Sequence, residues 1–384
     1  MGRNSRITRE SRVNHGGTRN ITGDIKRLVL ALPSLRAGGS ERVLLNLSQS
    51  LDRSRFDIHL IVVDPSGPYL DLVPSDVALH GLGHGRVSRG MVKLAVVLRR
   101  LKPDVVLSSI VHLNLALLLI RPLLPGKSRI YVRESNTPSI ALSMEKKGAL
   151  FRLLCPVLYP RADGIICPGE AVKRDLGLMF GISPEKIIAI PNPVQVHSIR
   201  SRISEYQVHT HKNAPKLLAM GSLTRQKGFD LLIAAMAKLV KIRPDIQLTI
   251  LGAGPEEANL IAQIKKENLS GCITLAGFKD NPYPYFYNAD LFVLSSRWEG
   301  LPNVVLESLA CGTPVVAFDC PGCVNEIFDE PSQGVLVPAG DVGALVMAID
   351  RRLKYLGKEC KNSILPDRFE ARSVTSQYEN ILAA

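Results

Sequence analysis

The fold is decided by residues 291–318, LFVLSSRWEGLPNVVLESLACGTPVVAF. The apolar run Leu291–Leu294 predicts a buried strand, Ser295–Asn303 a polar loop, and Val304–Cys311 a short helix. Gly312 is suited to the end of that helix, and a second buried strand follows it. The stretch therefore predicts a β–α–β unit, from which parallel sheets are built.

Two carboxylates lie at the mouth of this unit. Glu299 is in the loop beyond a strand's carboxyl end, and Glu307 is on the following helix, so both can face the crevice where open α/β sheets bind ligands. Glu299 could equally be a solvated loop charge, and Glu307 a residue favoured by the helix dipole. The spacing alone leaves both interpretations open.

Length and composition indicate a globular protein of two domains. The chain has 384 residues, 46% of them hydrophobic, which is more than one core usually supports. The net charge is +13, of which residues 1–27 carry +5. We predict that residues 1–25 form a disordered basic tail, because they are poor in apolar residues, and that they are no secretory signal. Such a basic tail could contact nucleic acid or anionic lipid, or be a solvated extension.

Seven cysteines without framework spacing fit a reducing compartment. Cys320 and Cys323 form a C-x-x-C, a weak signal for metal or redox function. Residues 105–124 are the nearest approach to a membrane span, but they contain several polar side chains, and we expect a strand followed by an apolar helix instead.

Strands alternate with helices over two segments, so we expect an α/β protein with two doubly wound, mainly parallel domains. The first domain is expected at 26–194 and the second at 215–365. We predict that residues 195–214 are a linker, because the periodic pattern of apolar residues is lost there. A helix in residues 366–384 is expected to return to the first domain.

Loops after two first-domain strands carry candidate ligand-binding residues at the same crevice. Gly38 and Gly39 lie between a strand, which we expect to end at Pro33, and a helix, where a backbone can approach phosphate. Arg133 and Glu134 follow another strand as candidate site residues, although a structural ion pair is an alternative for them.

A cationic turn suggests a diphosphate site in the second domain. In GSLTRQKGFD, Arg225 and Lys227 lie between a strand end and a helix start, although a solvated basic turn is equally consistent. The loop GAGPEE has Glu257 where a dinucleotide fingerprint needs its third glycine. There is no P-loop, no G-x-S-x-G elbow and no histidine or acid pair of the kind that binds a catalytic metal, so we predict no metal.

Five segments together resemble the retaining glycosyltransferases of family 4, which have the GT-B fold of two Rossmann-like domains facing a central cleft. The segments are GGSERVLLNL, GSLTRQKGFD, LTILGAGPE, LAGFKDNPYPYFYNADLFVLSSRWEGLPNVVLESLACGTPVVA and GVLVPAGD. The resemblance covers residues 26–384. It implies transfer of a hexose or N-acetylhexosamine from a nucleotide sugar, often a UDP-sugar, with neither metal nor cofactor.

The resemblance also implies roles for single residues. Glu299 would bind hydroxyls of the donor sugar, Glu307 the ribose, and Lys227 the diphosphate. Ser222 stands where the family usually has an arginine, for which Arg225 is a possible substitute.

The remaining donor positions follow the same motifs. The nucleotide base would lie at Gly277, Phe278 and Lys279, and the diphosphate near the backbone of Asn303, Val304 and Val305. Gly38 and Gly39 would approach the phosphates on domain closure.

On the acceptor side the family often has a histidine after the strand that here continues as RESNTP. Arg133 and Glu134 stand there instead, and His112 follows the preceding strand. The expected acceptor is a glycan or a polyprenyl-linked saccharide, and no nucleic-acid partner is predicted. The expected location is cytoplasmic, with peripheral contact to an anionic membrane. A GT-B epimerase, a phosphorylase and a non-catalytic sugar-nucleotide-binding protein remain alternatives.

Overall fold

The computed structural model describes residues 25–36, 38–83, 85–124, 126, 128–144, 148–205, 214–355 and 361–384. The predicted disordered tail lies outside the described residues except for Ile25, and so do residues 206–213 of the predicted linker.

The first sheet has seven parallel strands in the order β3-β2-β1-β4-β5-β6-β7. Its central strands are nearly continuous apolar runs, as expected of strands covered by helices on both faces. The strands are β1 (Lys26–Ser34), β2 (Phe56–Asp64), β3 (Ala78–Gly81), β4 (Val105–Ser109), β5 (Arg129–Arg133), β6 (Gly164–Cys167) and β7 (Ile187–Ala189). The helices are α1 (Gly39–Ser50), α2 (Val87–Leu101), α3 (Val111–Ile120), α4 (Pro138–Met144), α5 (Gly148–Leu158) and α6 (Glu170–Phe180).

The second sheet has six parallel strands in the order β10-β9-β8-β11-β12-β13. Its strands are β8 (Lys216–Met220), β9 (Gln247–Leu251), β10 (Ile273–Leu275), β11 (Leu291–Leu294), β12 (Val315–Asp319) and β13 (Gly334–Pro338). The helices are α8 (Phe229–Ile242), α9 (Glu257–Lys266), α10 (Tyr283–Asn288), α11 (Asn303–Ala310) and α12 (Val342–Lys354). The predicted α/β class with two doubly wound domains is confirmed.

The strand orders fix where ligands can bind. In the first sheet the order reverses between β1 and β4, and in the second between β8 and β11. Loops that leave the carboxyl ends of such strands diverge and form a crevice. The loops after β1, β8 and β11 carry the glycines, the cations and Glu299, and Glu307 lies on α11, which follows the last of these loops.

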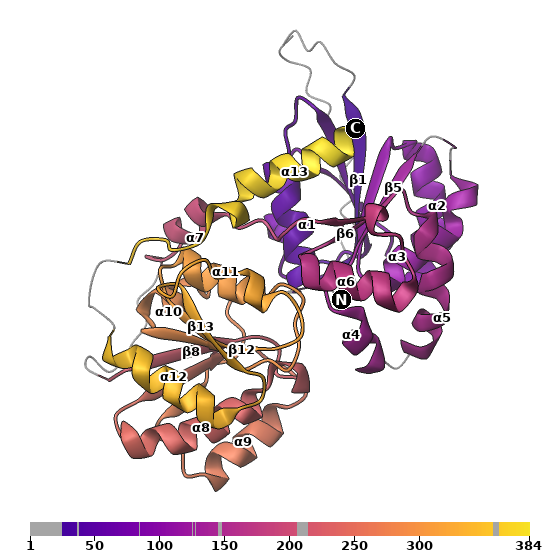
Figure 1. Cartoon of the computed structure of the whole chain (residues 1–384). Coiled ribbons are helices and arrows are strands. Elements are labelled where there is room, and N and C mark those ends of the chain that lie inside the picture. Colours follow the sequence, from indigo (N-terminus) through magenta and orange to yellow (C-terminus); the bar gives the residue numbers. More distant parts are fainter. Residues whose placement is uncertain are drawn as a thin grey trace, which may run out of the picture.

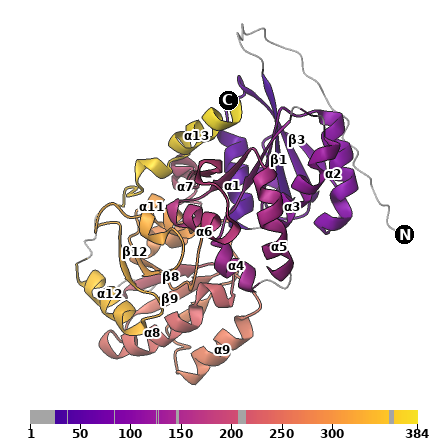
Figure 2. The same ribbon diagram turned by 45° about the vertical axis from the view of Figure 1, so that its right-hand side comes forward.

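The last helix crosses back to the first domain. Helix α13 (Ala371–Ala383) packs against α1, and the two views in Figures 1 and 2 show it running from the second domain along the first. Tyr378 and Leu382 are fully buried there, and the Arg129 guanidinium donates to the Leu382 carbonyl at 2.9 Å. The end of the chain is therefore part of the first domain's core.

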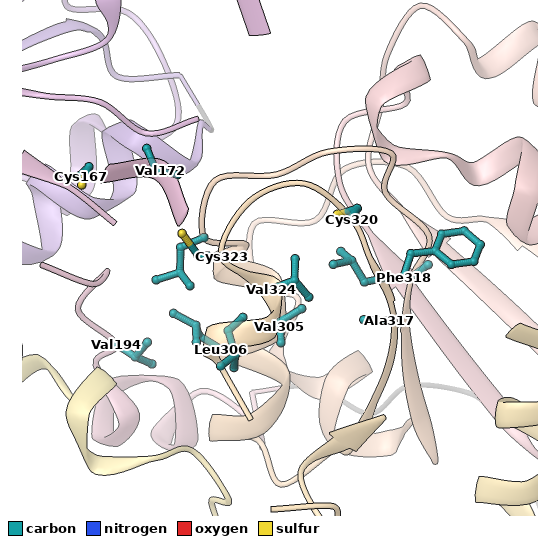
Figure 3. Packing of buried hydrophobic residues seen from close by; sticks show 14 of the residues in the cluster. Cys167, Val172, Val194, Val305, Leu306, Ala317, Phe318, Cys320, Cys323 and Val324 are labelled. Carbon is teal, nitrogen blue, oxygen red and sulfur yellow. The ribbon is translucent and has the colours of Figure 1, made fainter. Parts of the chain in front are cut away.

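A second contact between the domains involves the C-x-x-C segment. Figure 3 shows Cys323 near Cys167 and Val172 of the first domain, and a Cβ added to Gly169 would lie 2.7 Å from the Cys323 sulfur. Burial raises the pKa of both Cys320 and Cys323 to about 12, so these thiols stay protonated at neutral pH. Their environment is that of core residues.

Beside this contact, the Glu326 carboxylate of the second domain caps a helix of the first. It accepts hydrogen bonds from the backbone amides of Glu170 at 2.9 Å and Ala171 at 2.7 Å, at the start of α6. An acid is favoured there by the free amides and by the helix dipole. The domains are therefore joined by polar as well as apolar contacts.

Some predicted boundaries are wrong. Strand β1 runs through Pro33, which we expected to end it; the missing amide is tolerated because pairing with β4 already stops at Ala31. The predicted linker begins with a short helix, α7 (Val196–Ser201), anchored by the buried Ile199. Within the described part of the chain, no helix combines the length and apolarity needed to cross a membrane.

Candidate active site

A cavity of about 540 Å³ lies between the carboxyl ends of the two sheets. This is a typical size for a small-molecule site. Eleven of the predicted site residues line it: Gly38, Gly39, Arg133, Ser222, Lys227, Phe278, Lys279, Glu299, Asn303, Val304 and Glu307. They come from both domains, so the cavity exists only when the domains are together.

The predicted cation and the first predicted carboxylate form an ion pair in this cavity. Lys227 Nζ lies 2.6 Å from Glu299 Oε1, and Ser296 Oγ donates to the same oxygen at 2.6 Å. Glu299 is 4% exposed, so its interpretation as a solvated loop charge is wrong. The Lys227 side chain passes Gly221, where an added Cβ would lie 3.2 Å from three of its carbons. The ion pair is held where a ligand phosphate could compete for the lysine.

The Glu299 loop is held by the first domain. Thr137 Oγ1 donates to the Glu299 carbonyl at 2.9 Å, and Asn136 forms an antiparallel bridge with Gly300. Thr137 is buried, so solvent does not compete with its bond. The RESNTP segment, expected on the acceptor side, therefore also positions the predicted donor acid.

Glu307 lies one turn into α11 beside an arginine of the first domain. Burial raises the pKa of Glu307 above its ordinary value of 4.5, and the positive charge of Arg42 partly opposes this. Arg42 Nη2 donates to Tyr283 Oη at 2.8 Å, and its guanidinium lies 5.5 Å from the centre of the Tyr69 ring. Arg42 therefore brings first-domain charge to the predicted ribose carboxylate.

The raised pKa of Glu307 leads to a testable prediction about how stability depends on pH. Glu307 holds its proton more tightly in the folded state than in the unfolded state. Its contribution to the free energy of unfolding is therefore fully present below the unfolded pKa of about 4.5. That contribution is lost as the pH rises through the higher pKa of the folded state. We expect Glu307→Gln to gain stability relative to the unmodified chain as pH rises above 4.5. Urea unfolding of both proteins across this range measures the difference, and a difference independent of pH would contradict it.

The glycine loop faces the start of α11. Asn303 Nδ2 donates to the Gly39 carbonyl at 3.1 Å, and a Cβ on Gly39 would lie 3.4 Å from that nitrogen. Asn303 Oδ1 accepts from Asn192 Nδ2 at 2.6 Å. These bonds hold the predicted diphosphate amides of the second domain opposite the first-domain glycines.

Arg133 is 1% exposed and connects three parts of the chain. It donates to Tyr378 Oη of α13 at 3.2 Å, to Ser135 Oγ at 2.6 Å and to Asn192 Oδ1. Asn192 Nδ2 in turn donates to the Leu301 carbonyl of the second domain at 3.1 Å. Arg133 lines the cavity, but its donors are used by Tyr378, Ser135 and Asn192, and only Asn192 reaches the second domain.

Five predicted site residues do not line this cavity: Gly277, Val305, Arg225, Glu134 and His112.

The three on the donor side have other roles. The Gly277 carbonyl accepts from the Gly252 amide at 2.9 Å, and the Val305 amide donates to the Pro302 carbonyl at 3.0 Å. Arg225 is exposed on a short turn whose carbonyl accepts from Arg297 at 2.9 Å, so a role for Arg225 in the cavity is not supported.

The two on the acceptor side lie elsewhere. Glu134 is buried and accepts from Tyr159 Oη and from Asn114 Nδ2, the latter at 3.2 Å. This is a structural network, because Ser108 Oγ also donates to Asn114 Oδ1 at 2.7 Å. His112 lines a different cavity, beside α3.

The structure adds site residues that were not predicted. Arg42 is on α1, one turn after Gly38, which caps the start of that helix, and Asn192 lies between two prolines after β7; both line the cavity. The position of Arg42 on α1 was a usable signal, because residues one turn apart share a helix face. No group of three or more potential metal ligands occurs among the described residues.

Two Rossmann-like sheets, a cavity at both switch points, and a lysine–glutamate pair inside it define the class of GT-B glycosyltransferases. In the comparisons with known proteins, residues 37–198 match the family described as Glycosyltransferase Family 4, and residues 202–362 match Glycosyl transferases group 1. The chain belongs to glycosyltransferase family 4, and it is a glycosyltransferase.

Among curated relatives, one from Campylobacter jejuni is named N-acetylgalactosamine-N,N'-diacetylbacillosaminyl-diphospho-undecaprenol 4-alpha-N-acetylgalactosaminyltransferase. It is 30% identical over 352 residues, covering 88% of this chain and 93% of the relative. Among solved structures, Anabaena HepE in complex with UDP and glucose has a TM-score of 0.76 at 18% identity, covering 94% of this chain and all of that one. The lipopolysaccharide outer core galactosyltransferase WaaB has a TM-score of 0.68 at 17% identity, covering 92% and 98%.

Proposed function

We propose that this glycosyltransferase moves a hexose or N-acetylhexosamine from a UDP-sugar, with retention of configuration and without a metal, onto a polyprenyl-diphosphate-linked saccharide or related glycan. It would act in cell-surface polysaccharide or glycoconjugate assembly, at the cytoplasmic face of the membrane. The observation that carries the proposal is the Lys227–Glu299 pair of the second domain, which lies in the cavity that the two domains share. The names of the Campylobacter relative and of the UDP-bound Anabaena structure support the acceptor and donor classes.

The cavity offers an ordered set of contacts for such a donor. Phe278, 46% exposed, and Lys279 line the cavity and would contact the base, and Glu307 would bind the ribose hydroxyls. Lys227 and the first amides of α11 would bind the diphosphate, since helix starts favour phosphate. Glu299 would then meet the sugar.

The reaction depends more on stabilising the departing diphosphate than on a strong nucleophile. The bond from the anomeric carbon to the diphosphate oxygen breaks, the acceptor oxygen bonds to that carbon on the same face, and the acceptor proton goes to a departing phosphate oxygen. Lys227 is preorganised where negative charge grows, which is the interaction that most lowers such barriers. On donor binding the lysine would exchange Glu299 for phosphate, and Glu299 would accept hydrogen bonds from sugar hydroxyls.

A donor screen tests this proposal. Purified protein is incubated with UDP- and other nucleotide sugars, with and without lipid-linked saccharides, and the products are identified by mass spectrometry. We expect transfer only when the acceptor is present, unchanged by a chelator, and NMR should show the anomeric configuration of the donor retained. Inverted product would contradict retention, a changed nucleotide sugar without acceptor would indicate an epimerase, and binding without product a non-catalytic protein.

A further inference from the structure

A second large cavity lies in the first domain, away from the donor residues. It is an open groove of about 680 Å³ between α2, α3 and α5. Its wall is apolar and includes Met91, Leu115, Ala116, Leu119, Phe151 and Leu154. Leu119 is 47% and the neighbouring Leu150 49% exposed, so the groove is an apolar surface left open to solvent.

The rim of this groove is polar and carries a free positive charge. Arg36 and Asp64 pair at 3.1 Å, and Glu41 accepts from Ser34 at 3.2 Å. Arg86 also lines the groove and is exposed, and no carboxylate of the described residues forms an ion pair with it. An apolar wall with a cation at its rim is complementary to a chain that ends in an anion.

A small cavity lies between the groove and the donor cavity and shares lining residues with each. Its volume is about 60 Å³, and it shares Ile110 with the groove and Ser40, Ser135 and Asn136 with the donor cavity. Ile110, the residue just before α3, has a φ of 77°, a strained conformation for a β-branched residue. Such strain persists where the surrounding structure imposes it, commonly beside a functional site.

We infer that this groove binds the isoprenoid chain of a lipid-diphosphate-linked acceptor, with its diphosphate at Arg86 and its saccharide directed past Ile110 to the donor cavity. The inference rests on the proposed function and adds the place and chemistry of the acceptor's lipid end. It also gives His112 a position: it lines the groove, at the lipid side of the acceptor and away from the reacting hydroxyl.

Photo-crosslinking with a benzophenone-bearing farnesyl diphosphate tests the location directly. We expect crosslinks on α3 and α5, lost on competition with unlabelled farnesyl diphosphate but not with inorganic diphosphate alone. Competition by inorganic diphosphate would mean that only the anion is recognised, and crosslinks confined to other surfaces would place the chain elsewhere; either result overturns the inference.

Paired leucine variants test the consequence for turnover. Leu119 lines the groove, whereas Leu123, 57% exposed just after α3, does not. Burying a leucine side chain against the lipid would contribute to the free energy of binding. Leu119→Asp should therefore raise KM for a farnesyl-diphosphate-linked saccharide about tenfold or more. Leu123→Asp should leave this KM unchanged. For the same saccharide on a short water-soluble aglycone, both variants should match the unmodified enzyme.

The soluble acceptor separates the two proposals. If no sugar is transferred to either acceptor, the proposed function fails. If the soluble acceptor is used but Leu119→Asp has no effect on the lipid-linked one, the enzyme assignment stands and the groove is not its lipid site. Because both leucines are largely exposed, neither substitution is expected to prevent folding.

Discussion

Replacing Lys227 with alanine should lower kcat about a hundred- to thousandfold, the usual consequence of removing one preorganised donor from a developing negative charge. The lysine lies 2.6 Å from Glu299 in a cavity shared by the two domains, so it has few alternative positions. The substitution also leaves the Glu299 carboxylate, 4% exposed, without its cation. Initial rates at saturating donor measure the effect.

Arg225 is the matched control for this experiment. It carries the same charge on the same short turn, two residues earlier, but it is exposed and does not line the cavity. Arg225→Ala should therefore keep kcat within about threefold, as expected of a screened surface charge. Equal losses in both variants, or full activity of Lys227→Ala, would show that Lys227 does not stabilise the leaving group.

Replacing Gly300 with alanine should lower kcat about a hundredfold without unfolding the protein. A Cβ at this position would lie 1.8 Å from the Ser135 carbonyl oxygen of the first domain, closer than any real contact allows. The domains would have to separate there, moving the Glu299 carboxylate that precedes Gly300 and breaking the bond from Thr137. Displacements of about 1 Å near reacting groups cost about this much in rate.

The control is Gly271→Ala, because a Cβ there meets nothing within 4 Å. It should leave both kcat and the thermal midpoint unchanged. For Gly300→Ala we expect a nearly unchanged thermal midpoint and retained UDP affinity, since most donor contacts belong to the second domain. Normal turnover in this variant would mean that the close approach of the two loops is not required for catalysis.

The residues proposed to bind the donor could be predicted from the sequence for a physical reason. In doubly wound sheets, strand ends are marked by apolar runs followed by glycine and polar residues, and ligands bind at the switch point. Lys227, Glu299 and Glu307 follow such runs closely, and the structure brings all three to one cavity. The spacing of Glu299 and Glu307 left open whether these acids were solvated, because their burial depends on residues far away in the chain.

The residues proposed for the acceptor side were harder to predict from the sequence. Glu134 follows a strand as a site residue would, yet it points into a network with Asn114 and Tyr159. Arg133 lines the cavity, but its hydrogen bonds reach α13 and Asn192, which are distant in sequence. A charged side chain at a strand end can point toward the crevice or toward the core, and the local sequence does not distinguish these two orientations.

The sequence by itself determined the two parallel sheets, their helices and the chemistry of the donor loops, because these depend on local periodicity and turn residues. Only the tertiary structure decided that Lys227 is paired with Glu299, that Thr137 and Gly300 join the domains beside the cavity, and that the first domain has an open apolar groove. These features arise from contacts between residues far apart in the chain, whose geometry is fixed only when both domains pack together.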